Sequence, residues 1–137
     1  MSQNVIKKEF DDIIYELQKE VHDWFVECFS PKHGPSVLEI QSSPEIRDIR
    51  FYEEVTELMQ AGTISREKAH EIVDYVFNRA KGDIKQEVAG TMISLLSLCS
   101  CRGIDLLEET KKELSILYGK IDRIRGRQKD KPQPELR

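Results

Sequence analysis

Apolar residues recur along most of the chain at three- and four-residue steps, which is the spacing of one face of an α-helix. The first such run covers 5–29. Its apolar positions are Phe10, Ile13, Ile14, Leu17, Val21, Trp24, Phe25 and Cys28. Pro31, Gly34 and Pro35 follow, and both residue types disfavour a continuing helix. The pattern therefore predicts a long amphipathic helix, then a loop that extends to Ser43.

Capping residues divide the next part of the chain. Pro44 follows a serine and suits the first position of a second helix, which runs to about Ala61. Gly62 is expected to end this helix in a left-handed conformation. Ser65 is an N-cap for a third helix, which we expect to end near 81–82.

Two further caps begin the last two helices. Asp83 is the expected N-cap of a fourth helix, and Gly103 is expected to close it. Asp105 and Glu108 form a second capping box, which opens a fifth helix that reaches about Arg125. No long run alternates between apolar and polar residues, so no sheet is expected.

These elements predict an all-α fold, a helical bundle of about five helices. A chain of 137 residues suits one domain. We place that single domain at 1–128 and expect the polar, proline-containing segment 129–137 to be a flexible tail. Helical proteins of this size often extend their core by pairing subunits, so an oligomer is expected.

The charge of the chain limits the kinds of ligand and partner that it is expected to bind. Charged residues make up 34% of the chain and hydrophobic residues 39%, and the net charge is −4. This is more charge than an average domain carries, which indicates long exposed helix faces. A negative chain has no general attraction for nucleic acid, and a triphosphate would need bridging cations. We therefore expect no nucleic-acid partner.

The apolar runs and the cysteines of the sequence indicate the cellular compartment. No stretch reaches the ~18 apolar residues that a membrane span needs, and the first residues form no apolar signal region. Cys28, Cys99 and Cys101 are odd in number, and Cys99 lies in a strongly apolar run. Reduced core thiols are the natural interpretation. The sequence predicts a cytoplasmic protein without a membrane partner.

The second helix carries a cluster of acidic residues. With Glu53 at the origin of a helical wheel, Glu57 lies about 40° and Glu54 about 100° away, beside an apolar face. Like charges at i and i+4 destabilise a helix by a few tenths of a kcal/mol. A divalent cation would offset this cost. The alternative is a solvated acidic face in which Arg50 pairs with Glu54.

The fourth helix is apolar around most of its circumference, so we expect it to be largely buried. Glu87, Thr91 and Ser94 nevertheless form one polar stripe, which needs partners if it is buried. Pairing with a neighbouring helix is one solution. The other is that Glu87 joins the second-helix glutamates around a hard cation, Mg²⁺ or Mn²⁺.

Basic residues crowd the end of the fifth helix. They are Lys120, Arg123, Arg125, Arg127 and Lys129. Cations are favourable at the negative end of a helix dipole, which accounts for one or two of them. A phosphate clamp is the alternative.

At these residues the sequence resembles the MazG-like all-α nucleoside triphosphate pyrophosphohydrolase superfamily, over about 24–132. The motif EEVTE at 53–57 matches the EExxE of that superfamily, and EVAG at 87–90 occupies the place of its ExxD. Four segments resemble a phage-associated branch more closely: RFYEEVTELMQAG, VDYVFNR, QEVAGTMISLLSLC and KIDRIRGRQKDKP. The ExxD aspartate is replaced here by Gly90, for which Asp83 or Asp74 is a possible substitute.

The resemblance implies Mg²⁺-dependent hydrolysis of (deoxy)nucleoside triphosphates to a monophosphate and pyrophosphate. It implies Glu53, Glu54, Glu57 and Glu87 as metal ligands and catalytic residues, one of the first three acting instead as the base. Lys120 and Arg123 are the expected substrate phosphate contacts. A homodimer or homotetramer is expected by the same resemblance. The alternative is a non-catalytic nucleotide- or metal-binding protein, or a helical interaction protein, that has lost the second-motif aspartate.

Overall fold

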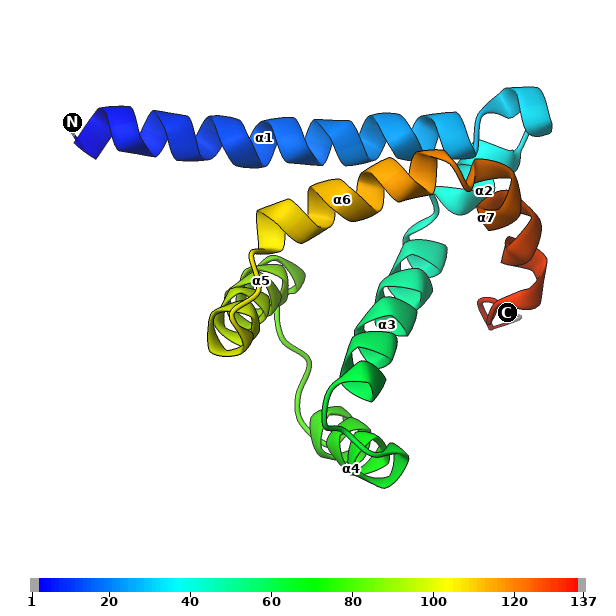
Figure 1. The fold of residues 1–137 in the computed structure, drawn as a ribbon. Coiled ribbons are helices and arrows are strands. Elements are labelled where there is room, and N and C mark those ends of the chain that lie inside the picture. The colour runs from blue at the N-terminus through cyan, green and yellow to red at the C-terminus, as the bar shows by residue number, and fades with distance from the viewer. Residues whose placement is uncertain (1–2, 136–137) are drawn as a thin grey trace. The chain divides into compact units, whose positions relative to one another are not determined.

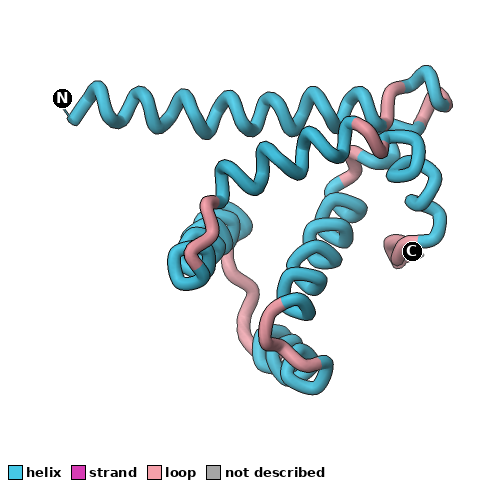
Figure 2. The backbone as a smooth tube through the Cα atoms, in the orientation of Figure 1, coloured by secondary structure: helices cyan, strands magenta, loops and turns pink. Residues whose placement is uncertain are grey.

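The computed structural model describes residues 3–135, apart from the side chains at 4–8 and 10, and this part is helical without any strand (Figures 1 and 2). The prediction of an all-α protein is confirmed. The described part holds seven α-helices and two short 3-10 helices, so the predicted number of about five is wrong. Two local features of the backbone account for the difference.

The first feature lies in the predicted loop, and the second in the predicted fifth helix. The loop contains the 3-10 helix η1 (Pro31–His33) and the short helix α2 (Val37–Gln41). The fifth helix is interrupted near Gly119 and becomes α6 (Leu106–Tyr118) and α7 (Ile121–Arg127). At this break the amide of Gly119 donates to the carbonyl of Ile116, an i−3 bond that ends α6.

The remaining helix bounds follow the capping signals closely. Helix α1 is Gln3–Cys28, α3 is Pro44–Ala61, α4 is Arg66–Phe77 and α5 is Ile84–Arg102. The Ser65 hydroxyl accepts from the amide of Lys68, and the Asp83 carboxylate accepts from the amides of Lys85 and Gln86. Gly103 ends α5 in the left-handed region, at φ 66°. These caps are confirmed.

One predicted cap conformation and one predicted helix end are wrong. Gly62 does not adopt a positive φ, because its amide donates to the carbonyls of Leu58 and Met59 and so continues the right-handed turn. Helix α4 ends at Phe77, earlier than predicted, with the amide of Asn78 bonded to the carbonyls of Asp74 and Val76.

The chain divides into two compact units, and the first comprises Met1–Arg47 and Lys111–Arg137. Its core lies where the last turn of α1 meets α7 (Figure 1). Cys28 and Phe29 are 0% and 2% exposed, and Ile46 and Leu114 are also buried. The ring of Phe29 packs edge-on against that of Phe25, at 5.1 Å between centroids. Apolar residues at the end of one amphipathic helix thus organise this unit.

The C-terminal segment belongs to the same unit. The predicted flexible tail 129–137 begins inside the 3-10 helix η2 (Gln128–Asp130). Beyond it, the side-chain amide of Gln133 donates to the carbonyls of Gln128 and Lys131, at 2.8 Å each. The last two positions, 136–137, lie outside the described residues.

The second unit, Asp48–Thr110, contains most of α3, all of α4 and α5, and the start of α6. The prediction that α5 is largely buried is wrong, since every residue from 84 to 94 is exposed. Ile84, Val88 and Ile93 are 71%, 63% and 68% exposed. On α4, Phe77 is 80% exposed. A single chain therefore leaves large apolar side chains of these two helices in solvent.

The cysteines are partly as expected. Cys28 and Cys99 are buried thiols, whereas Cys101 is exposed, so the prediction of a core position is wrong for Cys101. Within residues 3–135, no single helix is both long and apolar enough to cross a membrane. Helices α5 and α6 reach that length and composition only as a pair that is bent by 101°.

Candidate functional site

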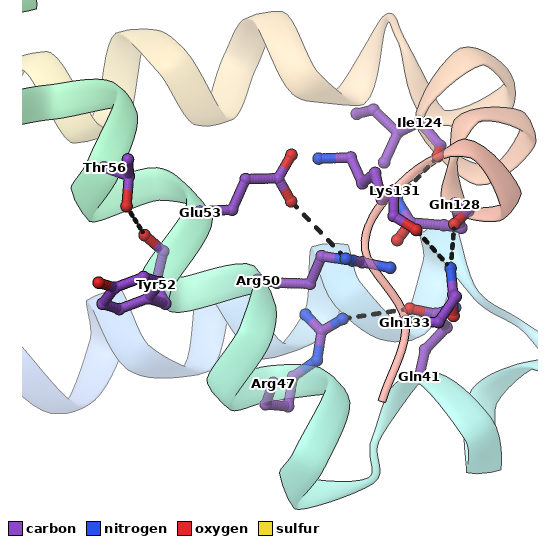
Figure 3. Close-up of polar contacts among 10 residues, drawn as sticks. All are labelled: Gln41, Arg47, Arg50, Tyr52, Glu53, Thr56, Ile124, Gln128, Lys131 and Gln133. Carbon is purple, nitrogen blue, oxygen red and sulfur yellow. Dashed lines mark hydrogen bonds and ion pairs between the residues drawn. The ribbon is translucent and has the colours of Figure 1, made fainter. Parts of the chain in front are cut away.

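The acidic motif lies in the middle of α3, where successive turns present Glu53, Glu54 and Glu57. Glu53 is partly buried, with a side chain 22% exposed, and its carboxylate lies 3.7 Å from the Nη1 atom of Arg50 (Figure 3). Glu54 and Glu57 are exposed. The distance between Glu53 and Arg50 is that of an ion pair rather than a hydrogen bond. Arg50, itself buried, thus offsets part of the repulsion among these carboxylates.

Glu87 lies in the first turn of α5, where a negative charge is favourable beside the free backbone amides. Its carboxylate folds back over Gly82, into the space that a side chain at that position would need. The hydroxyl of Thr91 donates to the Glu87 carbonyl at 2.8 Å. The predicted polar stripe of α5 is therefore satisfied in part by its own backbone, and it is exposed to water.

The four predicted metal ligands are not gathered around one position in the single chain. In the described part, no group of three or more His, Cys, Asp or Glu side chains is placed to hold a metal ion. Three glutamates lie on α3 and the fourth on α5, and these two helices do not pack extensively against each other. The arrangement within one chain thus does not fit a four-glutamate Mg²⁺ site.

Gly90 marks the place where the resembled motif has an aspartate. A Cβ atom built at this position would meet no other atom within 4 Å. Open space therefore surrounds the position, and packing in the single chain does not require a glycine here.

Three of the five basic residues at the end of the predicted fifth helix, Lys120, Arg123 and Arg125, line one pocket of about 480 Å³ in the first unit. Its charged lining consists of Lys32, Lys120, Arg123, Arg125, Glu27 and Asp122. The structure thus places the two predicted phosphate contacts, Lys120 and Arg123, in one pocket. The volume lies within the range of about 300–1,000 Å³ that is typical of small-molecule sites.

Arg125 holds the two sides of this pocket together. Its Nε atom donates to the carbonyl of Cys28 at 3.1 Å, and its Nη1 atom donates to the Asp122 carboxylate at 2.9 Å. Its Nη2 atom lies 2.9 Å from Nε2 of His33. The Arg125 side chain is 19% exposed. One guanidinium therefore joins α7 to the end of α1 and to η1.

His33 is neutral in this arrangement. A guanidinium only donates hydrogen bonds, so Nε2 of His33 must be the acceptor and the ring proton must lie on Nδ1. The pKa of His33 is lowered from its usual 6.5, first by desolvation and then by the positive charges of Arg125 and Lys32. The Asp122 carboxylate opposes this shift.

Sequence reasoning missed Lys32 and His33 as pocket residues. They lie in η1, a segment that was predicted to be loop, and about 90 positions separate them from α7. The local sequence offers no signal for this pairing. Only the packing of the end of α1 against α7 brings them to the basic residues.

Fold and side chains together define an all-α protein with an acidic turn on α3 and a basic pocket beside α7. Comparison with known proteins gives no match to a family model, to a curated protein or to a solved structure. The resemblance to MazG-like pyrophosphohydrolases therefore depends on the quoted sequence motifs alone, and it stays a prediction.

Proposed function

We propose that this protein hydrolyses (deoxy)nucleoside triphosphates to a monophosphate and pyrophosphate, with Mg²⁺ as the cofactor and Mn²⁺ as a possible substitute. The observation that supports this most is the acidic turn of α3. Glu53, Glu54 and Glu57 lie within two turns of one helix, and the carboxylate of Glu53 forms an ion pair with Arg50. Carboxylate oxygens are the ligands that such hard cations prefer.

We further propose that the metal site is completed in a homodimer or homotetramer. Glu87 lies on α5, several of whose apolar side chains, among them Ile84, Val88 and Ile93, are exposed in the single chain. Interfaces of obligate homodimers are apolar, and large exposed apolar patches mark such surfaces. In this proposal a second copy covers α5, and the Glu87 of one chain lies beside the α3 glutamates of the other.

Pyrophosphate release from the eight common nucleoside triphosphates, measured with purified protein and Mg²⁺, tests the reaction. We expect turnover of at least one nucleotide. Glu54→Gln should lower it by at least about 100-fold, since even the partners of metal ligands cost 10–100-fold when they are removed. Glu45→Gln, in the first turn of the same helix, is the matched control and should keep the activity. The absence of turnover with all eight nucleotides would contradict the proposal.

A non-catalytic binding or interaction protein is the second candidate. The glycine at position 90 and the exposed apolar residues of α4 and α5 favour it. A nucleotide-dependent rise in melting temperature without product would select a nucleotide-binding protein. If neither Mg²⁺ nor any nucleotide shifts the melting temperature, the helices serve protein interaction alone.

A further inference from the structure

The pocket beside α7 has an excess of positive charge. Arg125 and Asp122 form an ion pair and cancel, and His33 is neutral because its Nε2 atom accepts from Arg125. The remaining charged groups are Lys32, Lys120 and Arg123 against Glu27. Two positive charges are therefore left without a balancing carboxylate in the pocket wall.

We propose that this pocket binds the di- or triphosphate group of a small ligand directly, without a metal ion. The side chains of Lys32, Lys120 and Arg123 form no hydrogen bond or ion pair in the described structure, so their donors are available to a ligand. Several ammonium and guanidinium donors around one cavity suit the many acceptor oxygens of a phosphate chain. The pocket would then bind the phosphate chain of the substrate of the proposed hydrolase. That the ligand is a nucleotide rests on the proposed function.

Hydrogen bonds of Arg125 join the elements that form the pocket wall. The contacts of Arg125 with Cys28, Asp122 and His33 use four of its five N–H groups, and they fix α7 against the end of α1. The cations of η1 and of the start of α7 are thereby held beside one cavity. A preformed site binds more tightly because less side-chain freedom is lost on binding.

A small ligand fits this pocket better than a nucleic acid does. The whole chain carries a net charge of −4, so a long polyanion would meet repulsion beyond the pocket. The exposed ring of Tyr118 also lines the cavity. It offers an aromatic face to the base or sugar of a nucleotide, a contact that inorganic pyrophosphate lacks.

Calorimetric titration of the full chain with pyrophosphate in the presence of EDTA, at low salt, tests the binding. We expect saturable binding, and Lys32→Ala, Lys120→Ala and Arg123→Ala should each weaken it by about fivefold or more, as expected for charge-assisted bonds. Lys81→Ala removes one exposed lysine from the second unit and is the matched control. No binding, or an equal loss in the control variant, would overturn the proposal.

Two further arms separate the ligands and the functions. If a nucleoside triphosphate binds more tightly than pyrophosphate and Tyr118→Ala removes the difference, the pocket takes a nucleotide; equal affinities assign it to the phosphate chain alone. Because these titrations contain no metal and need no turnover, they stand apart from the hydrolase assay. Pyrophosphate binding without any hydrolysis would leave the pocket established and the proposed reaction wrong.

Discussion

At the scale of single residues, His33 reports the state of the basic pocket. Its folded-state pKa lies below the ordinary 6.5, so between these two values the unfolded chain binds more protons than the folded chain does. Stability therefore rises with pH across that window. The contribution of His33 is fully present above about pH 6.5 and is lost as the pH falls through the window. Protonation also removes the acceptor for Arg125.

An NMR titration of the His33 ring should therefore show a midpoint below 6.5, its ordinary value. Arg125→Gln should raise this midpoint, because it removes a neighbouring positive charge and also opens the site to water. Arg66→Gln, on the exposed surface of α4, should leave it unchanged. Added pyrophosphate should raise the midpoint in the native protein, since a nearby anion favours the imidazolium form. If Arg125→Gln leaves the midpoint of the His33 titration unchanged, this account of the pocket is wrong.

Gly90 allows a second prediction at a single residue. Since open space surrounds the position, Gly90→Asp should fold normally, and glycine is in any case a poor residue for a helix interior. If Glu87 is a metal ligand, an aspartate one turn later should raise Mg²⁺ affinity and turnover. Gly126→Asp, also at an open helical position, is the control and should change neither. Calorimetry with Mg²⁺ measures the effect, and equal affinities would argue against a site at Glu87.

At the scale of helices, features that depend on neighbouring residues were predictable. The bounds of α3, the Ser65 and Asp83 caps and the left-handed Gly103 all follow from local hydrogen bonding. The short helix α2 was missed because a helix of five residues leaves almost no periodic pattern. The break between α6 and α7 was also missed. Gly62 shows the limit of a local rule, since a glycine after a helix need not adopt a positive φ.

The candidate sites divide in the same way. The sequence located the acidic turn of α3 and the basic end of the chain, because each lies within one short segment. It could not show that Lys32 and His33 join the basic residues, since only packing in the first unit does so. The burial of α5 was wrongly predicted because an apolar circumference indicates that burial of the helix would be favourable, and it does not show that the rest of the same chain packs against it.

The exposed side of helix α5 allows a test of whether it forms an interface between copies of the chain. Val88 is 63% exposed, so Val88→Glu should cost the isolated chain little stability. If a second copy covers this side of α5, a buried unpaired carboxylate should prevent assembly. Ser97→Glu places the same group about 180° around the helix and is the control. Light scattering after size-exclusion chromatography gives the mass; an unchanged oligomer with Val88→Glu would show that this side of α5 is not the interface.

At the scale of the whole molecule, the separated acidic residues and the exposed apolar helix faces both raise the question of whether the protein assembles from several copies. Within a chain, Glu87 does not join Glu53, Glu54 and Glu57 in a group that could hold a metal. The same chain leaves apolar residues of α4 and α5 in water. The proposed association of copies would account for both observations, because the helix that it covers, α5, also carries Glu87, the proposed fourth ligand. Assembly and activity should then depend on each other.

Mixing two inactive variants tests this dependence directly. If each site takes Glu87 from a second copy, a mixed dimer of Glu54→Gln and Glu87→Gln contains one site with both native residues and one with neither. Exchange of subunits at equal amounts should then restore about a quarter of the native activity per chain, because half of the dimers are mixed and each holds one intact site. If all four glutamates belong to one chain, every site in the mixture keeps a defect. Pyrophosphate release that stays at the level of the separate variants, although light scattering shows exchanged dimers, would exclude a shared site.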